Sequence, residues 1–313
     1  MKSFSAQAKE ELARIEPGKP CCMLSELCAL LYTAGTLSLL SGGMLRLRVE
    51  SKHAATVRRA FQLLRKQFDV QPTLTTVKNS RLGGRSGYRV ELEGDEARRV
   101  LSACGLLGDQ AYVLLKEEDL LSHTMKACCR QAFLRGAFLG AGSVANPEKE
   151  YHLEFVATDE SLGNVLIALL ERQGLQARSV ERKGSVVVYV KEAEQIVELL
   201  SVLGAHAARC ALEDVRILKS LRNQVNRATN CDSANIAKAL DASGRQLNAI
   251  DRIERQIGLE RLPEPLQEVA RRRRQYPEMT LIELGKTLRP PVGKSGVNHR
   301  LKRIEEIAAA LGE

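Results

Sequence analysis

The side chains of this chain that are best suited to chemistry are amide, imidazole and basic groups near its C-terminal end. Ser295, Asn298, His299 and Lys302 recur at intervals of three and four residues, with Arg303 beside them. On a helix, this spacing places them on one exposed face. Amide and basic side chains there can read base edges, and no nucleophile or carboxylate is patterned around His299 for catalysis. The pattern indicates contact with a nucleic acid rather than an enzyme centre.

The same region carries a concentrated positive charge. The whole chain of 313 residues has a net charge of +9, and between Arg261 and Arg303 there are 11 Lys and Arg residues against 4 Asp and Glu, a surplus of 7. This excess is typical of a module that binds a polyanion, although a solvated charged face would show it too. The residues that we expect to contact DNA phosphates or bases are Arg271, Arg272, Arg273, Arg274, Arg289, Lys294, Ser295, Asn298, His299, Arg300, Lys302 and Arg303.

Three helices must position these side chains. The first begins near Pro265 and ends before Pro277, and because its four consecutive arginines span all sides, at least one of their stems should pack along the core. Thr280 and Glu283 form a capping box that opens a short second helix, 281–288. The third, from about 295 to 311, should bury one apolar stripe. That stripe consists of Val297, Leu301, Ile304, Ala308 and Leu311.

This arrangement predicts a helix-turn-helix at about 279–312, in which the third helix is the recognition helix and the second crosses the DNA backbone. The alternative is a three-helix bundle that has no role in DNA binding.

Two helices rich in small residues organise the first two-thirds of the chain. The stretch 133–143 (FLRGAFLGAGS) contains Gly136 and Gly140, and the stretch 27–36 (LCALLYTAGT) contains Ala29 and Thr33 at matching positions. Such residues let two helices approach at backbone distance. Each of them is the first element in the order helix, strand, helix, strand, strand, helix, which gives repeats at about 20–108 and 125–205. We therefore expect a pseudo-twofold domain in which the two helix ends meet at the centre.

The stretch 133–143, with this order of elements, resembles the LAGLIDADG motif of homing endonucleases. The resemblance implies two sheets that form one saddle, and an acidic residue before the last glycine of each motif that holds a divalent metal at the scissile phosphate. Ala34 and Ala141 stand at those two positions. Because a methyl group cannot ligate Mg²⁺, we predict a degenerate domain without nuclease activity.

Basic residues also lie on or near the strands that form the saddle in that family. They fit either a nucleic-acid face or the wet side of an ordinary half-exposed sheet. These residues are Arg46, Arg48, Lys78, Arg81, Arg85, Arg89, Arg178, Arg182 and Lys183.

The eight cysteines show no CxxC spacing. Small buried side chains in a reducing compartment are the plain interpretation, and a metal site or disulfides are the alternative. We therefore predict no metal and no cofactor. The cysteines are Cys21, Cys22, Cys28, Cys104, Cys128, Cys129, Cys210 and Cys231.

The junction between the two parts is polar. Residues 206–228 predict one connecting helix, and the run 230–238 either caps a helix at Ser233 or contacts phosphate. Ser243 and Gln246 form a second capping-box pattern that would open another helix. The expected divisions are 1–205, 206–228 and 229–313. The expected fold class is α+β, with a duplicated αβαββα domain followed by an all-α helix-turn-helix domain.

The runs 279–285 with 294–301, and 230–235, resemble the WhiA family of bacterial regulators, and the likeness covers the whole chain. The resemblance implies a DNA-binding protein that regulates transcription in sporulation, or is linked to cell division and chromosome segregation. A division-associated scaffold and an active homing endonuclease are the other hypotheses; Ala34 and Ala141 disfavour the latter.

The implied partners are double-stranded DNA and a second regulatory or division protein that contacts the duplicated domain. The N-terminus runs directly into the charged Lys9, Glu10 and Glu11, and no apolar run has the roughly 18–20 residues of a membrane span. We expect no membrane partner and a cytoplasmic, nucleoid-associated protein.

Overall fold

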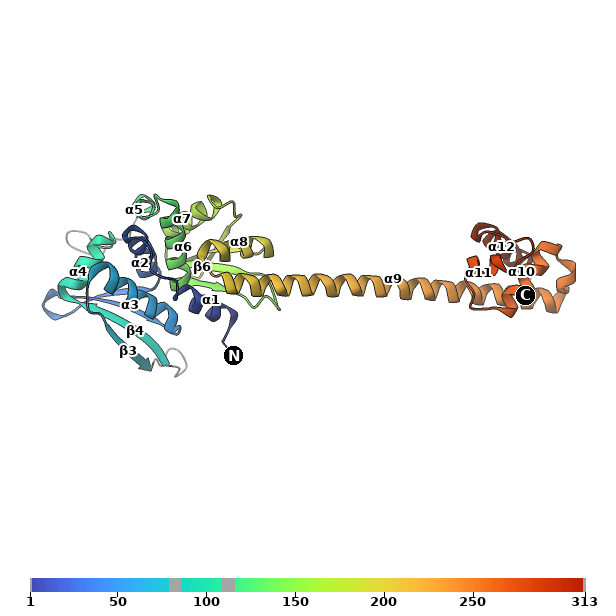
Figure 1. The fold of residues 1–313 in the computed structure, drawn as a ribbon, viewed down its shortest axis with the longest axis horizontal. Coiled ribbons are helices and arrows are strands. Elements are labelled where there is room, and N and C mark those ends of the chain that lie inside the picture. The colour runs from blue at the N-terminus through green and yellow to red at the C-terminus, as the bar shows by residue number, and fades with distance from the viewer. Residues whose placement is uncertain (1, 79–85, 108–115, 312–313) are drawn as a thin grey trace. The chain divides into compact units, whose positions relative to one another are not determined.

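The computed structural model describes residues 2–78, 86–107 and 116–311. The chain divides into two compact units, residues 1–219 (unit 1) and 220–313 (unit 2), and the division falls inside the expected connecting helix. Figure 1 shows both units with their elements labelled. The expected saddle residues Arg81 and Arg85 lie outside the described residues.

Unit 1 is α+β and unit 2 is helical, as predicted. The elements of unit 1 are α1 (Phe4–Leu12), α2 (Pro20–Ala34), β1 (Gly35–Leu39), η1 (Ser41–Gly43), β2 (Leu45–Ser51), α3 (Ala54–Phe68), β3 (Thr73–Lys78), β4 (Ser86–Glu93), α4 (Gly94–Ala103), α5 (Glu117–Ser122), α6 (Ala127–Ala141), β5 (Gly142–Val144), β6 (Leu153–Ala157), α7 (Glu160–Glu171), β7 (Arg178–Arg182), β8 (Ser185–Val190) and α8 (Ala193–Leu203). Helix α9 (His206–Gln256) begins in unit 1 and continues into unit 2, where η3 (Leu259–Arg261), α10 (Glu264–Gln275), α11 (Leu281–Lys286) and α12 (Lys294–Ala310) follow.

The duplication in unit 1 is visible in its two sheets. Both are antiparallel and four-stranded, with the orders β1-β2-β4-β3 and β5-β6-β8-β7. In β2, Leu45, Leu47 and Val49 are buried while the arginines between them are partly exposed, as the alternating sequence predicts. The two repeats therefore have the same strand order around their entry helices α2 and α6.

Each repeat contains one strand more than the sequence pattern predicted. Strands β1 and β5 begin at Gly35 and Gly142, directly after α2 and α6 end. A Cβ atom on Gly35 would clash with the carbonyl oxygen of Leu31, so glycine allows the chain to leave the helix at once. The prediction missed β5 because three residues are too few to show an alternating pattern.

Helices α2 and α6 pack against each other in the middle of unit 1 (Figure 1). A Cβ atom on Gly136 would meet the carbonyl oxygen of Glu26 and lie 3.1 Å from the Cβ atom of Ala29, and one on Gly140 would clash with the hydroxyl of Thr33. The expected small-residue contact between the two helices is confirmed.

One hydrophobic core spans both repeats of unit 1. It contains side chains from both sheets and from α2, α3, α4, α6, α7 and α8. Phe138 of α6 packs edge-to-face on Phe155 of β6, with ring centroids 6.0 Å apart. The two halves therefore fold around a shared centre and not as two separate domains.

Helix α9 corrects the prediction for the junction. It runs without a break through residues 230–238, so Ser233 caps no helix, and Ser243 lies in its interior. The hydroxyl of Ser243 instead donates a 2.7 Å hydrogen bond to the carbonyl oxygen of Pro277. Each small polar residue lowers the stability of a helix by only about 0.5 kcal/mol relative to alanine, so a long hydrogen-bonded helix can contain several of them. The capping interpretations of Ser233 and Ser243 are wrong.

Unit 2 has a core of its own. Ile250 and Ile253 of α9 pack with Leu266, Val269 and other residues from η3, α10, α11 and α12. This core holds the short helix α11 and the longer helix α12 in the order that a helix-turn-helix requires.

Candidate nucleic-acid interface

The predicted recognition helix is present as α12. Its apolar stripe, Val297, Leu301, Ile304 and Ala308, is at most 3% exposed, and Leu311 packs against the same core. Burial of this stripe fixes which side of α12 faces solvent. The residues of α12 that we predicted to contact DNA lie on the other sides of the helix.

The preceding helix α11 is held by local contacts that the sequence predicted. The hydroxyl of Thr280 accepts a 3.3 Å hydrogen bond from the amide of Glu283, whose carboxylate accepts a 2.9 Å bond from the amide of Thr280. The hydrogen bonds that the Glu283 carboxylate accepts from the amide and the hydroxyl of Thr280 lower the pKa of Glu283. At the other end, a Cβ atom on Gly285 would clash with the carbonyl oxygen of Val292, whose amide donates to the Gly285 carbonyl at 3.0 Å. The capping box is confirmed, and glycine permits close approach of the turn.

The exposed face of α12 carries four of the twelve predicted contact residues. Ser295, His299, Lys302 and Arg303 are exposed. Arg303 forms a 2.8 Å ion pair with Glu306 in the next turn, whereas the side chain of His299 has no hydrogen-bond partner within the described residues. An exposed side chain without such a partner, like that of His299, can form hydrogen bonds to another molecule.

Asn298 and Lys294 lie on one flank of that face. They line a largely apolar groove of about 530 Å³ between α9 and the starts of α11 and α12. Asn298 is half-buried, and in the part of the chain that the structure describes neither side chain has a hydrogen-bond partner. The amide of Asn298 can therefore donate and accept hydrogen bonds with a ligand.

Arg300 lies on the opposite flank, because two residues on a helix are roughly 200° apart around its axis. It lines a second hollow, of about 760 Å³, together with Arg271 and Arg272 of α10 and Arg289 of the turn. Glu264 and Glu268 lie in the same hollow, so its four arginines leave a positive excess. The structure brings these arginines together although they are separated by up to 29 positions in the sequence.

The four consecutive arginines of α10 have different environments. Arg271 is exposed, and Arg272 donates a 3.2 Å hydrogen bond to Gln275. Arg274 pairs with Asp251 of α9 at 2.9 Å. Arg273 is 3% exposed and its guanidinium donates to the carbonyl oxygens of Met279 and Pro277, at 2.7 and 3.3 Å. Burial lowers the pKa of Arg273. Arg273 is therefore the arginine whose stem packs against the core, as expected for one of the four. It was wrongly included among the expected phosphate contacts, because its guanidinium is buried.

The former metal positions in unit 1 are at the ends of the paired helices. Ala34 is the last residue of α2 and Ala141 the last of α6. Near the end of α6, the ammonium of Lys9, 4% exposed, donates a 3.1 Å hydrogen bond to the carbonyl oxygen of Leu139. This buried ammonium is therefore held close to the last turn of α6.

The pKa values of this region follow from the same arrangement. Burial, followed by the charge of Lys52, lowers the pKa of Lys9 to about 8. Burial, followed by the charges of Lys9 and Lys52, lowers the pKa of His53 to about 4. Both groups are therefore less basic in the folded protein than in the unfolded chain.

Replacing Lys9 by Met should change the pH dependence of stability. The pKa of Lys9 is about 8 in the folded protein and 10.5 in an unfolded chain. The unfolded chain therefore binds more protons between these values, and the free energy of unfolding should rise with pH across this window. Lys9→Met should lack that rise in denaturant titrations from pH 8 to 10.5. Parallel stability curves for the two proteins would contradict the assignment.

The saddle arginines of the first sheet are paired with carboxylates. Arg48 lies opposite Glu91 on the neighbouring strand and forms a 2.8 Å ion pair with it, and Arg89 pairs with Glu50 at 2.6 Å. Arg46 pairs with Glu91 and Glu93. Each of these three arginines is therefore balanced by a carboxylate on a neighbouring strand. The side chain of Lys78 lies outside the described residues. In the second sheet, Arg178 and Arg182 lie on the exposed strand β7, and Lys183 follows in the turn.

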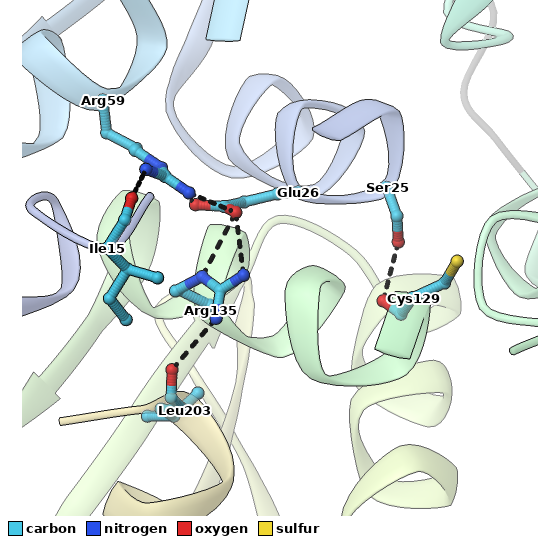
Figure 2. A network of polar contacts seen from close by, with 7 residues as sticks. All are labelled: Ile15, Ser25, Glu26, Arg59, Cys129, Arg135 and Leu203. Atoms are coloured by element: carbon cyan, nitrogen blue, oxygen red, sulfur yellow. Dashed lines mark hydrogen bonds and ion pairs between the residues drawn. The ribbon is translucent and has the colours of Figure 1, made fainter. Parts of the chain in front are cut away.

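Sequence reasoning missed two constellations in unit 1. One is a buried network in which Glu26 binds Arg59 and Arg135 (Figure 2). The other is a cluster of four cysteines, Cys21, Cys22, Cys128 and Cys129, which is the only group of three or more His, Cys, Asp or Glu side chains in residues 2–78, 86–107 and 116–311 that could hold a metal ion. The signal for the cluster was present in the sequence, because both pairs occupy the same position in the duplicated helix.

In the helices that the structure describes, none is long and apolar enough to cross a membrane.

Comparison with known proteins agrees with this architecture over nearly the whole chain. The WhiA N-terminal LAGLIDADG-like domain matches residues 20–107, the WhiA LAGLIDADG-like domain residues 130–222, and the WhiA C-terminal HTH domain residues 225–308. The chain is 46% identical over 311 residues to a protein of Heliobacterium modesticaldum named "Probable cell division protein WhiA", covering 99% of this chain and 97% of that protein. It is 43% identical over 310 residues to a protein of the same name from Alkaliphilus metalliredigens, covering 98% and 97% of the two chains.

A solved structure agrees as well. The crystal structure of full-length DUF199/WhiA from Thermatoga maritima is similar to this chain with a TM-score of 0.61 and 25% sequence identity, and the match covers 100% of both chains. The duplicated LAGLIDADG-like unit, the helix-turn-helix unit and these relatives together place the chain in the WhiA family.

Proposed function

We propose that this protein binds double-stranded DNA at specific sequences through α12 and regulates transcription. The observation that carries the proposal is the N-terminal half of α12, where Ser295 and His299 are exposed opposite a buried apolar stripe and Asn298 lies half-buried at the flank of that face. A recognition helix inserted in the major groove has one phosphate backbone on each side. Lys294 on one flank and Arg300, with its neighbouring arginines, on the other are suitably placed for those two backbones.

The genes that we expect it to regulate are those of cell division, chromosome segregation or sporulation. The relatives are named probable cell division proteins, which supports the first of these. An occupancy map of the tagged protein across the genome tests the proposal, because a regulator should occupy sharp sites near promoters that disappear when unit 2 is removed. Diffuse occupancy would contradict it and favour a division-associated scaffold.

For unit 1 we propose a role without DNA cleavage. Alanine at the ends of both paired helices supports this proposal, because its methyl group cannot ligate a metal ion. The charge-paired first sheet favours a regulatory or division protein as the partner of this unit. Metal-dependent cutting of duplex DNA by the purified protein, abolished by changes at Ala34 and Ala141, would overturn the proposal.

Replacing Asn298 by Ala should relax specificity at one base position. The loss of a bidentate base contact costs about 1–3 kcal/mol on the preferred site, and random DNA should be bound almost as before. Competition titrations with single-base variants of the site measure both effects. Asn248→Ala, at an exposed position of α9 in the same unit, is the matched control. Equal losses on specific and random DNA would exclude a base-reading role.

Replacing Arg271 by Gln should weaken binding to all sequences alike. Loss of one phosphate contact should reduce the slope of log K against log salt by about 1. Arg274→Gln should change the slope less, because Asp251 already pairs with Arg274. Salt titrations on random duplex compare the two variants. If Arg271→Gln and Arg274→Gln reduce the slope of log K against log salt equally, the ion pair with Asp251 does not keep Arg274 from contacting DNA.

A further inference from the structure

The four clustered cysteines lie at the beginnings of the two central helices. Cys21 and Cys22 are the second and third residues of α2, and Cys128 and Cys129 are the second and third residues of α6. Their four Sγ atoms all lie within 4.8 Å of one another. Cys22 and Cys129 are 7% and 5% exposed, Cys21 is half-buried and Cys128 is exposed. The pseudo-twofold relation of the helices thus brings two distant pairs to one point.

This spacing fits one tetrahedral metal ion. Four sulfurs held about 2.3 Å from a zinc ion lie about 3.8 Å from each other, so side-chain adjustments of less than about 1 Å close the cluster on the ion. An iron–sulfur cluster needs its cysteine sulfurs further apart, because they bind different iron atoms. A single disulfide would use two of the four thiols and would not account for the convergence of all four.

The surroundings favour the anionic charge that such a site carries. Zn²⁺ with four thiolates has a net charge of −2, and the positive ends of two helix dipoles meet it here. The residues directly before the two helices are Lys19 and Lys126, and neither helix has an acidic residue in its first turn. These two helix ends and lysines are compatible with an anionic metal site.

A hydrogen bond between the helices supports one of the ligand residues. The hydroxyl of Ser25 in α2 donates a 2.8 Å bond to the carbonyl oxygen of Cys129 in α6, as Figure 2 shows. Ser25 is itself fully buried. This contact fixes the start of α6 against α2 and holds the two cysteine pairs at their present separation.

We propose that Cys21, Cys22, Cys128 and Cys129 bind one Zn²⁺ ion in a structural site that joins the two repeats of unit 1. The thiols release their protons to solvent when the ion binds. The site is distinct from the former nuclease centre, because α2 and α6 each have 15 residues and their opposite ends are about 22 Å apart. The ion would join the two helices at their beginnings.

Metal analysis of the full-length protein tests the proposal. Protein purified under reducing conditions without chelators should contain one zinc per chain, and replacement of the zinc by Co²⁺ should produce thiolate charge-transfer and tetrahedral ligand-field bands. Removal of the zinc with a strong chelator should lower the Tm of unit 1. A protein that neither contains nor takes up zinc, that contains iron instead, or whose intact mass shows disulfides under these conditions would overturn the proposal.

Variants separate the four ligands from the other cysteines. Cys128→Ser changes the exposed member of the cluster, so it should fold, and its zinc affinity in chelator competition should fall by at least about tenfold. The double variant Cys210→Ser/Cys231→Ser changes two exposed cysteines of α9 outside the cluster and should retain one zinc with unchanged affinity. Unchanged zinc binding by Cys128→Ser would exclude this four-cysteine site.

Discussion

Replacing Glu26 by Gln should lower the free energy of unfolding of unit 1 by about 3–5 kcal/mol. Glu26 is 1% exposed and binds two guanidiniums, that of Arg59 at 2.6 and 2.8 Å and that of Arg135 at 3.1 Å. Arg59 also donates to the carbonyl oxygen of Ile15, and Arg135 to that of Leu203 at 3.3 Å (Figure 2). Glutamine keeps the shape but leaves two buried positive charges without a counter-charge.

The control for Glu26 is an isosteric change at the surface. Glu50 pairs with Arg89 on the partly exposed side of the first sheet, so Glu50→Gln should cost less than about 1 kcal/mol. Denaturant unfolding followed by a probe in unit 1 compares the two variants. If Glu26→Gln costs as little as Glu50→Gln, the buried network does not hold the two repeats together.

Replacing Gly136 by Ala should cost unit 1 about 1–3 kcal/mol, although alanine is the better helix former. The added Cβ atom would clash with the carbonyl oxygen of Glu26, which is backbone and cannot turn aside. Helices α2 and α6 would have to separate along the whole contact. The loss in packing should exceed the gain of about 1 kcal/mol in helix propensity.

The same substitution at Gly244 should have the opposite sign. Gly244 lies inside α9, is exposed, and a Cβ atom there would meet nothing within 4 Å. Gly244→Ala should therefore stabilise the helix by up to about 1 kcal/mol. Hydrogen exchange along α9 and thermal unfolding of unit 1 measure the two effects separately. Equal stabilisation by both changes would show that α2 and α6 do not need glycine at their contact.

Local patterns in the sequence predicted much of the fold and of the proposed interface. The apolar stripe of α12 repeats at helical intervals, and the Thr280–Glu283 capping box forms within one turn. The repeat and its small-residue helices were also predicted, because small residues at a contact between helices recur every four positions, as Gly136 and Gly140 do. Such features depend on neighbours three or four positions away, which the sequence displays directly.

Predictions failed where a side chain's environment depends on distant parts of the chain. Ser243 and Gln246 show a capping pattern, but α9 continues through them and Ser243 binds the carbonyl oxygen of Pro277. Arg273 and Arg274 are adjacent in the sequence, yet one is buried and the other pairs with Asp251. These environments are set by hydrogen bonds and ion pairs to other elements, and the neighbouring residues in the sequence do not display them.

The sequence by itself determined the duplicated architecture, the alanines at the ends of the paired helices and the basic helix α12 with its apolar stripe. Only the tertiary structure decided which arginines share a hollow, that Glu26 neutralises Arg59 and Arg135, and that four cysteines converge. The physical reason is that amphipathic periodicity and helix caps act over a few residues. Burial, charge pairing and metal coordination depend on distances in space, which the packing of α2 against α6 establishes between residues more than a hundred positions apart.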